Sequence, residues 1–385
     1  MQPGVPFPQK LTGALLKCFS MPENLAVIAI PTPLSTQLTS GANSLHLSEF
    51  RGALTPYEFD APDKEIAALA KGAAAHDLGW MRRVKVNGED RFRWLSGMVT
   101  NTVNGLAENS GAWNLVLNAQ GRIQGDLTVW REGDALDLEI AADQYDKLIA
   151  HLDRFIIMDD VELVAQDPTA ETSVGLTGPQ AGDVLRRMGL PVPPEPMTWQ
   201  RVEWNGHNLR VHHGYGTLAE HFEIVTPLAG LTLLWRALST AGAMPVGVGA
   251  LEAFRVAEGI ATYGRDIAER DLPQETSQTR ALHFNKGCYL GQEIVERIRS
   301  RGNVHRHLRQ LEMQGPLPDP GTELLLEGAP VGQITSASEL PMQGEVRRFA
   351  LAMVRSEAET KAQPLIYTLG PAAGTAHLLN RPPAL

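Results

Sequence analysis

The chain has 385 residues, of which 43% are hydrophobic and 20% are charged, and this composition excludes a disordered tail or a fibre. Its net charge of −10 excludes a general electrostatic grip on DNA or an anionic membrane, so any nucleic-acid contact must be local. No apolar run approaches the roughly 20 residues that a membrane-spanning helix requires. The length favours two or three folded units.

The two cysteines, Cys18 and Cys288, lie far apart, and one pair is not the framework of a disulfide-rich secreted domain. We therefore expect reduced thiols. Two thiols cannot by themselves hold a conventional four-cysteine iron–sulfur cluster, although a transiently shared ligand stays open. The first 20 residues lack a credible signal peptide, and Met21 could be the true start, so we expect a cytoplasmic protein.

The first 62 residues are rich in Pro, Ser, Thr and Gly, which favours a loosely ordered extension over a folded domain. From Asp63 onwards, the spacing of apolar residues predicts a helix that runs to a stop at 76–79. A strand is expected directly after this stop, at 81–86.

The middle of the chain contains an internal similarity. A strand, a glycine turn and a helix at 84–95 recur in the same order at 174–185. A strand followed by a helix at 138–152 likewise recurs at 222–238. Such common units can recur by chance, but two matches in the same order favour a duplication that produced two related α+β modules.

Two further regions have patterns that are typical of strands. Residues 114–117 and 126–130 predict a hairpin around a tight turn at 119–121, which places Asp126 at the start of a strand. Between 308 and 354, short apolar segments separated by Pro and Gly predict a C-terminal β-barrel. The expected division is an extension at 1–62, α+β modules at 63–170 and 171–304, a β-barrel at 305–370, and a loosely held tail at 371–385.

The most informative segment is KGCYLGQE, at 286–293. It predicts a corner between a strand at 282–284 and a following helix, with Cys288 just before the N-terminus of that helix. Unpaired amide donors, the helix dipole and the charge of Lys286 would then lower the pKa of the thiol below its ordinary value of about 8.5. An ionised thiol is nucleophilic and binds soft metals; the alternative is a small buried hydrophobic side chain.

This segment, with the downstream Arg297, Arg306 and Leu308, resembles the signature of the YgfZ-type folate-binding proteins. These are bacterial relatives of a mitochondrial iron–sulfur assembly factor, in the superfamily of the glycine cleavage T-protein, an aminomethyltransferase. The resemblance covers roughly residues 65–355. It includes His76-Asp77-Leu78, the hairpin with Gly121 and Asp126, Phe222-Glu223-Ile224, a helix at 251–257 with Arg255, Gly259, Tyr263-Gly264 with Asp266, and Leu272-Pro273 with Glu275.

The resemblance implies an α+β fold of three domains around a central opening, with a folate pocket there and the cysteine motif facing it. T-protein relatives generally carry an acidic residue at the position of Cys288, so the thiol favours the iron–sulfur branch. One position departs from the pattern: Ala257 stands where relatives commonly have Glu, and Glu258 follows it. This departure leaves the role of Glu258 open.

A pterin ring is flat and presents N–H donors, so its pocket needs carboxylate acceptors and an aromatic or apolar surface. The resemblance makes Asp126 and Glu223 the candidate acceptors for tetrahydrofolate, with Trp80 and Trp113 as candidate stacking partners. Arg255 is the candidate for the anionic glutamate tail. The alternatives are a turn cap for Asp126, a solvent-facing Glu223, and core positions for both tryptophans.

A local basic strip follows the cysteine motif in this acidic protein. It could bind polyglutamyl folate, RNA phosphate or an acidic partner protein; the alternative is a solvated helix face followed by a linker. The spacing of its two histidines suits opposite faces, so we expect no metal site there. The strip consists of Arg297, Arg299, Arg301, His305, Arg306, His307 and Arg309.

The leading hypothesis is a folate-binding accessory factor for the assembly or repair of iron–sulfur proteins. Cys288 would be its reactive thiol and Lys286 would lower the pKa of that thiol. Effects on tRNA modification would follow indirectly, through iron–sulfur modifying enzymes. The alternatives are a tetrahydrofolate-dependent aminomethyltransferase or related one-carbon transferase, and a folate-binding scaffold without turnover. Iron–sulfur client or assembly proteins are the expected partners; we expect no membrane or direct DNA binding, and RNA contact stays open.

Overall fold

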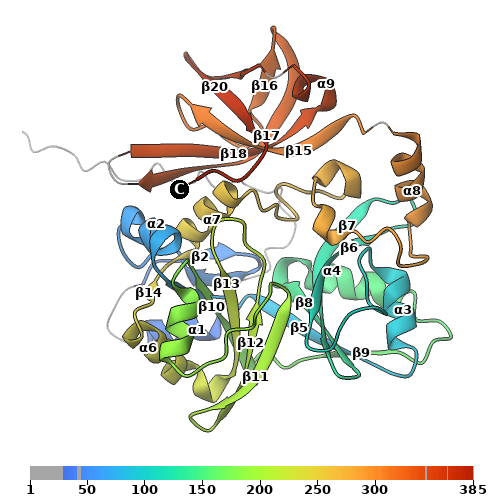
Figure 1. The fold of residues 1–385 in the computed structure, drawn as a ribbon, viewed down its shortest axis with the longest axis vertical. Helices are drawn as coiled ribbons and strands as arrows, with labels where there is room; N and C mark the ends of the chain where they lie inside the picture. Colours follow the sequence, from blue (N-terminus) through green and yellow to red (C-terminus); the bar gives the residue numbers. More distant parts are fainter. Residues whose placement is uncertain (1–28, 41–44, 303, 343–344, 362, 385) are drawn as a thin grey trace, which may run out of the picture.

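The computed structural model describes residues 29–40, 45–302, 304–342, 345–361 and 363–384, and Cys18 and Met21 lie outside these ranges. Figure 1 shows two neighbouring α+β modules, in teal and in green, with a β-barrel in orange and red above them. Among the described residues, none of the helices is both long and apolar enough to cross a lipid bilayer.

The first module is built on a five-stranded antiparallel sheet with the order β6-β7-β8-β5-β9. Apolar side chains of the sheet, such as Leu127 and Leu138, pack with Leu95 of α3 and Leu148 of α4 in one buried cluster. The elements are β5 (Met81–Asn87), α3 (Arg91–Met98), β6 (Gly111–Leu117), β7 (Ile123–Glu132), β8 (Ala135–Ala141), α4 (Ala142–Asp153) and β9 (Glu162–Ala165).

The second module repeats this plan. Its sheet has the order β11-β12-β13-β10-β4-β14, which is the order of the first sheet with β4 inserted beside β10. The repeated strand order confirms the expected pair of related modules. The elements are β4 (Ala74–Asp77), β10 (Glu171–Thr177), α5 (Ala181–Arg187), β11 (Thr198–Trp204), β12 (His207–His213), β13 (His221–Pro227), α6 (Leu231–Thr240) and β14 (Met244–Pro245).

The N-terminal segment differs from the loosely ordered extension expected for residues 1–62. Within its described part, β1, β3 and β2 form a three-stranded sheet in that order, and α1 packs beside it. α2 then begins at Pro62, one residue before the predicted start. The elements are β1 (Ile30–Pro31), α1 (Pro33–Thr39), β2 (Leu47–Phe50), β3 (Ala53–Pro56) and α2 (Pro62–Lys71).

The N-terminal segment is folded because its hydroxyl side chains bond to a buried carboxylate of the second module. Asp77, at the end of β4, is only 2% exposed. Its carboxylate accepts hydrogen bonds from the hydroxyls of Thr32 and Thr55 and from the backbone N–H of Gly79. A buried carboxylate requires such donors. The threonines that suggested disorder therefore fix the segment to the second module.

Two local predictions are corrected at this level. α2 ends at Lys71, and 74–77, which the sequence assigned to the end of the helix, is strand β4 inside the second sheet. The hairpin of β6 and β7 forms as expected, with Gly121 at φ +70° in its turn. However, Asp126 is the fourth residue of β7 and not the first.

The C-terminal part is a closed barrel with the strand order β15-β18-β17-β16-β19-β20. Its last strand lies within the range expected to be a loosely held tail, 371–385, because β20 pairs with both β19 and β15 and closes the barrel. The elements are β15 (Arg306–Gln314), β16 (Glu323–Leu326), β17 (Ala329–Met342), β18 (Glu345–Arg355), α9 (Ser356–Glu359), β19 (Leu365–Leu369) and β20 (Ala372–Leu379).

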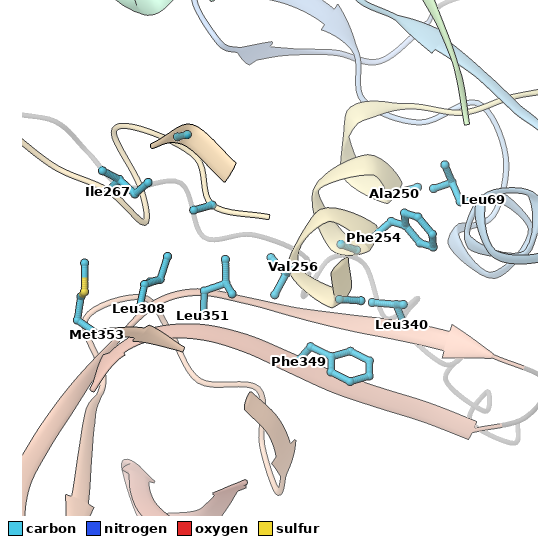
Figure 2. Close-up of a cluster of buried hydrophobic side chains, with 14 of the residues drawn as sticks. Leu69, Ala250, Phe254, Val256, Ile267, Leu308, Leu340, Phe349, Leu351 and Met353 are labelled. Carbon is cyan, nitrogen blue, oxygen red and sulfur yellow. The ribbon is translucent and has the colours of Figure 1, made fainter. Parts of the chain in front are cut away.

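A single apolar cluster joins the barrel to the modules through α7 (Val248–Glu258), which extends the helix predicted at 251–257 by a few residues. Figure 2 shows Phe254 and Val256 of α7 above the barrel strands that carry Leu340, Phe349 and Leu351. Because burial of side chains of this size contributes roughly 2 kcal/mol each, the cluster holds the barrel firmly against α7.

Candidate functional site

The two sheets face each other, and the surface between them is polar. Trp130 of β7 stacks on His212 of β12, with ring centroids 4.4 Å apart. Arg83 of β5 forms an ion pair with Glu223 of β13 across the same surface. The duplicated modules therefore meet through strand residues that point away from each module's own helices.

A buried ion cluster lies at this surface and consists of Arg83, Glu139, His212 and Glu223. Arg83 donates to Glu139 at 2.8 Å and to Glu223. Burial and the neighbouring Glu223 raise the pKa of Glu139. Burial would also raise the pKa of Glu223, but Arg83 and His212 outweigh it and hold that pKa well below its ordinary value. Three of these residues are metal-ligand types, yet the guanidinium of Arg83 already supplies the positive charge.

A chain of hydrogen bonds runs beside this cluster from β4 to α7. His221 Nε2 lies 2.9 Å from Glu258, whose carboxylate also accepts backbone N–H groups from the 217–218 turn. With the His221 ring neutral, its Nδ1 accepts from the hydroxyl of Thr177, which in turn accepts from His76 Nε2. Burial lowers the pKa of His76 to about 3, so this ring is neutral. Glu258 thus has a structural partner in this second module.

Asp126 is positioned by two side chains at the half-buried end of the same polar surface. Gln144 of α4 accepts from the backbone N–H of Asp126 and donates to Asp126 Oδ1 at 2.8 Å. Trp113 Nε1 donates to Asp126 Oδ2 at 2.9 Å. These bonds fix the plane of the carboxylate. Each oxygen keeps acceptor capacity for a ligand, because a carboxylate can accept about four hydrogen bonds.

Arg280 completes this site. It is the middle residue of a short 3₁₀ turn, η3 (Thr279–Ala281), and its guanidinium carbon lies 4.4 Å from the ring centroid of Trp113 and 3.9 Å from that of Tyr215. Burial lowers the pKa of Arg280 to about 10, which leaves it charged at neutral pH. We call Trp113, Asp126, Tyr215 and Arg280 the central site.

The KGCYLGQE segment has a different local structure from the one predicted. No strand forms at 282–284 in the described structure; η3 is followed by irregular chain. Cys288 lies in this irregular chain and is exposed to solvent. Lys286 points elsewhere: its Nζ donates to the carbonyls of Ser96 and Val99, at 2.5 and 2.6 Å, where α3 ends. Lys286 therefore caps a helix, and its ammonium is not available to pair with the thiol.

The same segment is docked on the β6–β7 hairpin through close backbone contact. Gly291, at φ +79°, precedes α8 (Gln292–Arg301), and a Cβ there would lie 2.5 Å from the carbonyl oxygen of Asn118. A Cβ on Gly121 would likewise lie 2.8 Å from the Ile294 side chain. The glycines in the motif and in the hairpin turn therefore allow one element to rest on the other.

Arg255 is not available to a ligand. Its five N–H donors are all used, by Glu252 twice and by Asp266, the Ile260 carbonyl and the Ser336 hydroxyl once each. These partners come from α7, from the following loop and from barrel strand β17. The expected contact with a glutamate tail is therefore replaced by an interdomain ion-pair cluster.

The other two predicted residues lie apart from the central site. Trp80 packs edge-on against Phe50, with centroids 5.4 Å apart, and donates to the carbonyl of Asp77. Glu223 is neither exposed nor free, because Arg83 pairs with its carboxylate. Of the five proposed folate contacts, the structure thus joins only Asp126 and Trp113 directly.

The basic strip does not form one surface. Arg306 pairs with Glu275 at 3.0 Å, and both His307 and Arg309 bind the carboxylate of Glu359, at 2.8 and 2.9 Å. These three basic side chains thus contact carboxylates at the start of the barrel.

The remaining members lie around α8. Arg297 and Arg299 are exposed, and Arg299 lies 3.5 Å from Glu296 on the same helix. His305 is exposed in the connection that follows, and the side chain of Arg301 lies outside the described part of the chain. The strip is thus reduced to a short stretch of solvated helix.

Sequence reasoning missed four residues of this region: Gln144, Tyr215, His221 and Arg280. Gln144 and Tyr215 gave no signal, because they reach Asp126 and Arg280 only through tertiary contact. Arg280 stands eight residues before Cys288 and lacked any periodic context. His221 directly precedes Phe222-Glu223-Ile224, and strand alternation puts it on the same face as Glu223, so it could have been found.

Comparison with known proteins agrees with this architecture. Residues 37–286 match the family described as the GCVT N-terminal domain. Aminomethyltransferases of a Nostoc species and of Rubrobacter xylanophilus are each 28% identical, over 87% and 83% of this chain and 91% and 86% of their own lengths. A chloroplastic putative transferase of Arabidopsis thaliana is 27% identical over 72% of this chain, which spans 65% of that relative's length.

The crystal structure of the glycine cleavage system aminomethyltransferase T from Bartonella henselae has the same fold. It superposes with a TM-score of 0.79 over 90% of this chain and 96% of its own, at 20% identity. This likeness confirms the expected fold of two related modules and a barrel. Since the matched segment spans well over half of the chain, the protein belongs to the GCVT family.

Proposed function

We propose that the protein binds tetrahydrofolate at the central site and acts as an accessory factor in the assembly or repair of iron–sulfur proteins. The observation that carries the folate part is the carboxylate of Asp126, fixed by Gln144 and Trp113 at the half-buried edge of a polar surface. The iron–sulfur part is supported by the exposed Cys288 within the YgfZ-like KGCYLGQE segment.

The residues present fit a reduced pterin. A pterin offers an amino group and ring N–H donors, and Asp126 offers oriented acceptors for them. Trp113 and Tyr215 offer aromatic surface, and Arg280 lies against both rings with hydrogen-bond donors for a part of the ligand outside the pterin ring. Tetrahydrofolate, when bound, supplies a carrier for one-carbon units. The contribution of the chain is to hold the ligand and, through Asp126, to accept a proton or a hydrogen bond at a fixed position.

In this proposal Cys288 acts on the iron–sulfur client rather than on folate. Exposure makes the thiol accessible to a partner protein or to a cluster in transit, both of which would be external to this chain. Lys286 contributes by holding the segment against the end of α3. Effects on tRNA modification would follow indirectly, through modifying enzymes that need clusters.

Tetrahydrofolate titration by calorimetry tests the folate part. Asp126→Asn should weaken binding at least tenfold, because a hydrogen bond to a charged acceptor is worth roughly 1.5–3 kcal/mol. Asp134→Asn is the matched control, since Asp134 is an exposed carboxylate in the turn after the same strand. If Asp126→Asn binds tetrahydrofolate with wild-type affinity, the Asp126 carboxylate does not contact the ligand.

Complementation of a strain that lacks the protein tests the iron–sulfur part. Cys288→Ala should fail to restore the activity of iron–sulfur enzymes, while its affinity for tetrahydrofolate stays within twofold of wild type. Full restoration by Cys288→Ala would discard the thiol as the functional group.

A second candidate is folate-dependent aminomethyl or related one-carbon transfer, which is favoured by relatives named aminomethyltransferases over more than 80% of this chain. In that case Asp126 would orient folate towards an amine donor. Tetrahydrofolate-dependent release of ammonia from an aminomethyl donor, with the carbon recovered as methylenetetrahydrofolate, would favour this candidate over the accessory role if it is lost in Asp126→Asn but kept in Cys288→Ala.

A further inference from the structure

The guanidinium of Arg280 lies against two aromatic rings. Its central carbon lies 3.9 Å from the ring centroid of Tyr215 and 4.4 Å from that of Trp113. At these distances the guanidinium carbon lies over both rings, within the range of cation–π interactions. The five N–H donors of a guanidinium point outward in its plane, along its edge.

That edge has no protein partner in the part of the chain that the structure describes. Neither a hydrogen bond nor an ion pair to the Arg280 guanidinium occurs there, whereas Arg83, Arg255 and Arg306 each pair with two or more carboxylates. A shielded cation with unused donors is costly to keep unless it has a ligand.

The backbone of this arginine is fixed from the first module. Asn101 Nδ2 donates to the carbonyl of Arg280 at 2.8 Å and to that of Trp113 at 3.0 Å. The hydroxyl of Thr100 donates to the carbonyl of Ala281 at 2.7 Å. Arg280 and the ring beneath it are thus held by one amide side chain, and the donor edge is pre-organised.

The charged side chains near Arg280 include two carboxylates, but neither forms a hydrogen bond with it. Asp126 and Glu258 both stabilise the charged form of Arg280 through space, and Asp126 is tied to Gln144 and Trp113 instead. The site therefore offers acceptors beside a set of free cationic donors. A ligand that matches it carries N–H donors at one position and an anion at another.

We propose that Arg280 is an anion-binding residue of the central site and takes a carboxylate of the ligand along the edge of its guanidinium. Two parallel N–H···O bonds to a carboxylate are the geometry for which this edge is suited. The inference rests on the proposed folate function and deepens it. The carboxylate has two sources, the glutamyl tail of tetrahydrofolate or a small amino acid bound beside it.

Calorimetric titrations under argon distinguish these sources. The full-length protein is titrated with tetrahydrofolate, with 6-methyltetrahydropterin, which lacks the glutamyl tail, and with N-methylglycine in the presence of the pterin. If the tail is the ligand, Arg280→Gln should bind tetrahydrofolate at least tenfold more weakly and bind the pterin like wild type. If an amino acid is the ligand, only the N-methylglycine affinity should fall.

Three further variants keep the experiment decisive. Arg280→Lys keeps the charge without the planar edge and should lose only part of the affinity. Tyr215→Leu removes one of the two rings that contact the Arg280 guanidinium and should also lose part of the affinity. Arg236→Gln removes an exposed arginine of α6 and should change none of the affinities. A wild-type circular-dichroism spectrum and thermal midpoint in each variant show that the protein is folded.

The outcomes separate this inference from the folate proposal. If wild type binds tetrahydrofolate and Arg280→Gln binds all three ligands equally well, the anion-binding inference is overturned while folate binding stands. If wild type binds neither tetrahydrofolate nor the pterin, the proposed function fails, and the inference survives only if N-methylglycine alone binds in an Arg280-dependent way. Absence of binding to every ligand overturns both.

Discussion

Two buried carboxylates share one arginine where the modules meet, and their pKa values move in opposite directions. Glu223 is held ionised by Arg83, whereas burial and the adjacent Glu223 raise the pKa of Glu139. The geometry explains the split, because one guanidinium in a buried position neutralises one carboxylate better than two. At near-neutral pH the folded protein therefore holds a proton on Glu139 that the unfolded chain releases.

We predict from this that Glu139 contributes a fall in the free energy of unfolding as the pH rises from about 5 to 8, seen as the difference in slope between wild type and Glu139→Gln. A raised carboxyl pKa in the folded state adds stability that is complete below the unfolded pKa of about 4.3 and is lost as pH rises through the folded value. Glu139→Gln cannot titrate, so it should remove on the order of 1–2 kcal/mol of that decline. Urea denaturation at several pH values measures the slope.

The control for this prediction is Glu108→Gln, since Glu108 is exposed and lies outside the cluster. Its slope should equal that of wild type. A wild-type slope in Glu139→Gln would mean that Glu139 is ionised in the folded protein.

The sequence predicted chemistry at single residues only where the residue types themselves limited the choice. Asp126 was found because a carboxylate on a hairpin strand matched a family position, and the structure ties it to Trp113. Arg255 matched a family position equally well, yet its donors are used by Asp266 and four other acceptors. Whether an arginine is free or bound depends on tertiary partners, which a linear pattern does not contain.

At the scale of elements, the part of the KGCYLGQE segment that precedes α8 has no regular structure and depends on its two glycines for its backbone path. Gly287 and Gly291 both have positive φ, at +99° and +79°, but their surroundings differ. A Cβ on Gly287 would meet nothing within 4 Å, whereas one on Gly291 would lie 2.5 Å from the Asn118 carbonyl. Comparison of substitutions at Gly287 and Gly291 therefore separates the free-energy cost of backbone strain from that of a steric clash.

We therefore predict unequal effects of two identical substitutions. Gly287→Ala should cost about 1 kcal/mol, from the left-handed backbone alone. Gly291→Ala should cost a further 1–3 kcal/mol, because the hairpin backbone must move to admit the methyl group. Denaturant midpoints at constant slope give both values. Equal costs would show that the contact between the segment and the hairpin is loose.

Helices and strands were predicted correctly where apolar and polar residues followed a regular period. The prediction failed where tertiary contacts determined the backbone conformation. The hairpin of β6 and β7 and helix α7 follow their own patterns. The segment 282–284 resembled a strand in the sequence, but its backbone bonds to the first module instead. The N–H of His283 donates to the Thr100 carbonyl. Hydrogen bonding to a distant loop thus replaced sheet formation.

For the whole molecule, the duplication was visible in the sequence because each copy keeps its own strand, turn and helix order. The insertion of β4 between β10 and β14 was not visible, since it requires a segment from before the first module to pair in the second. The barrel was predicted from its turns, but its closure by β20 was missed because Ala and Gly make up half of that strand.

The three parts are joined by Arg255 as well as by apolar packing. Its guanidinium binds Glu252 within α7, Asp266 in the following loop and Ser336 in the barrel. The Asp266 side chain is fully buried. Removal of the guanidinium would leave that carboxylate without its cation, which typically costs 3–5 kcal/mol.

We predict that Arg255→Gln destabilises the whole protein by about 3 kcal/mol without removing ligand binding. Arg265→Gln is the matched control: Arg265 also binds Glu252 but is 44% exposed, so its loss should cost well under 1 kcal/mol. Thermal unfolding gives the stabilities, and tetrahydrofolate titration well below the midpoint gives the affinity. Since every donor of Arg255 has a protein partner, affinity should stay within twofold. If Arg255→Gln instead stays stable but loses affinity, Arg255 contacts the ligand. Apolar packing alone would then hold the barrel against the modules.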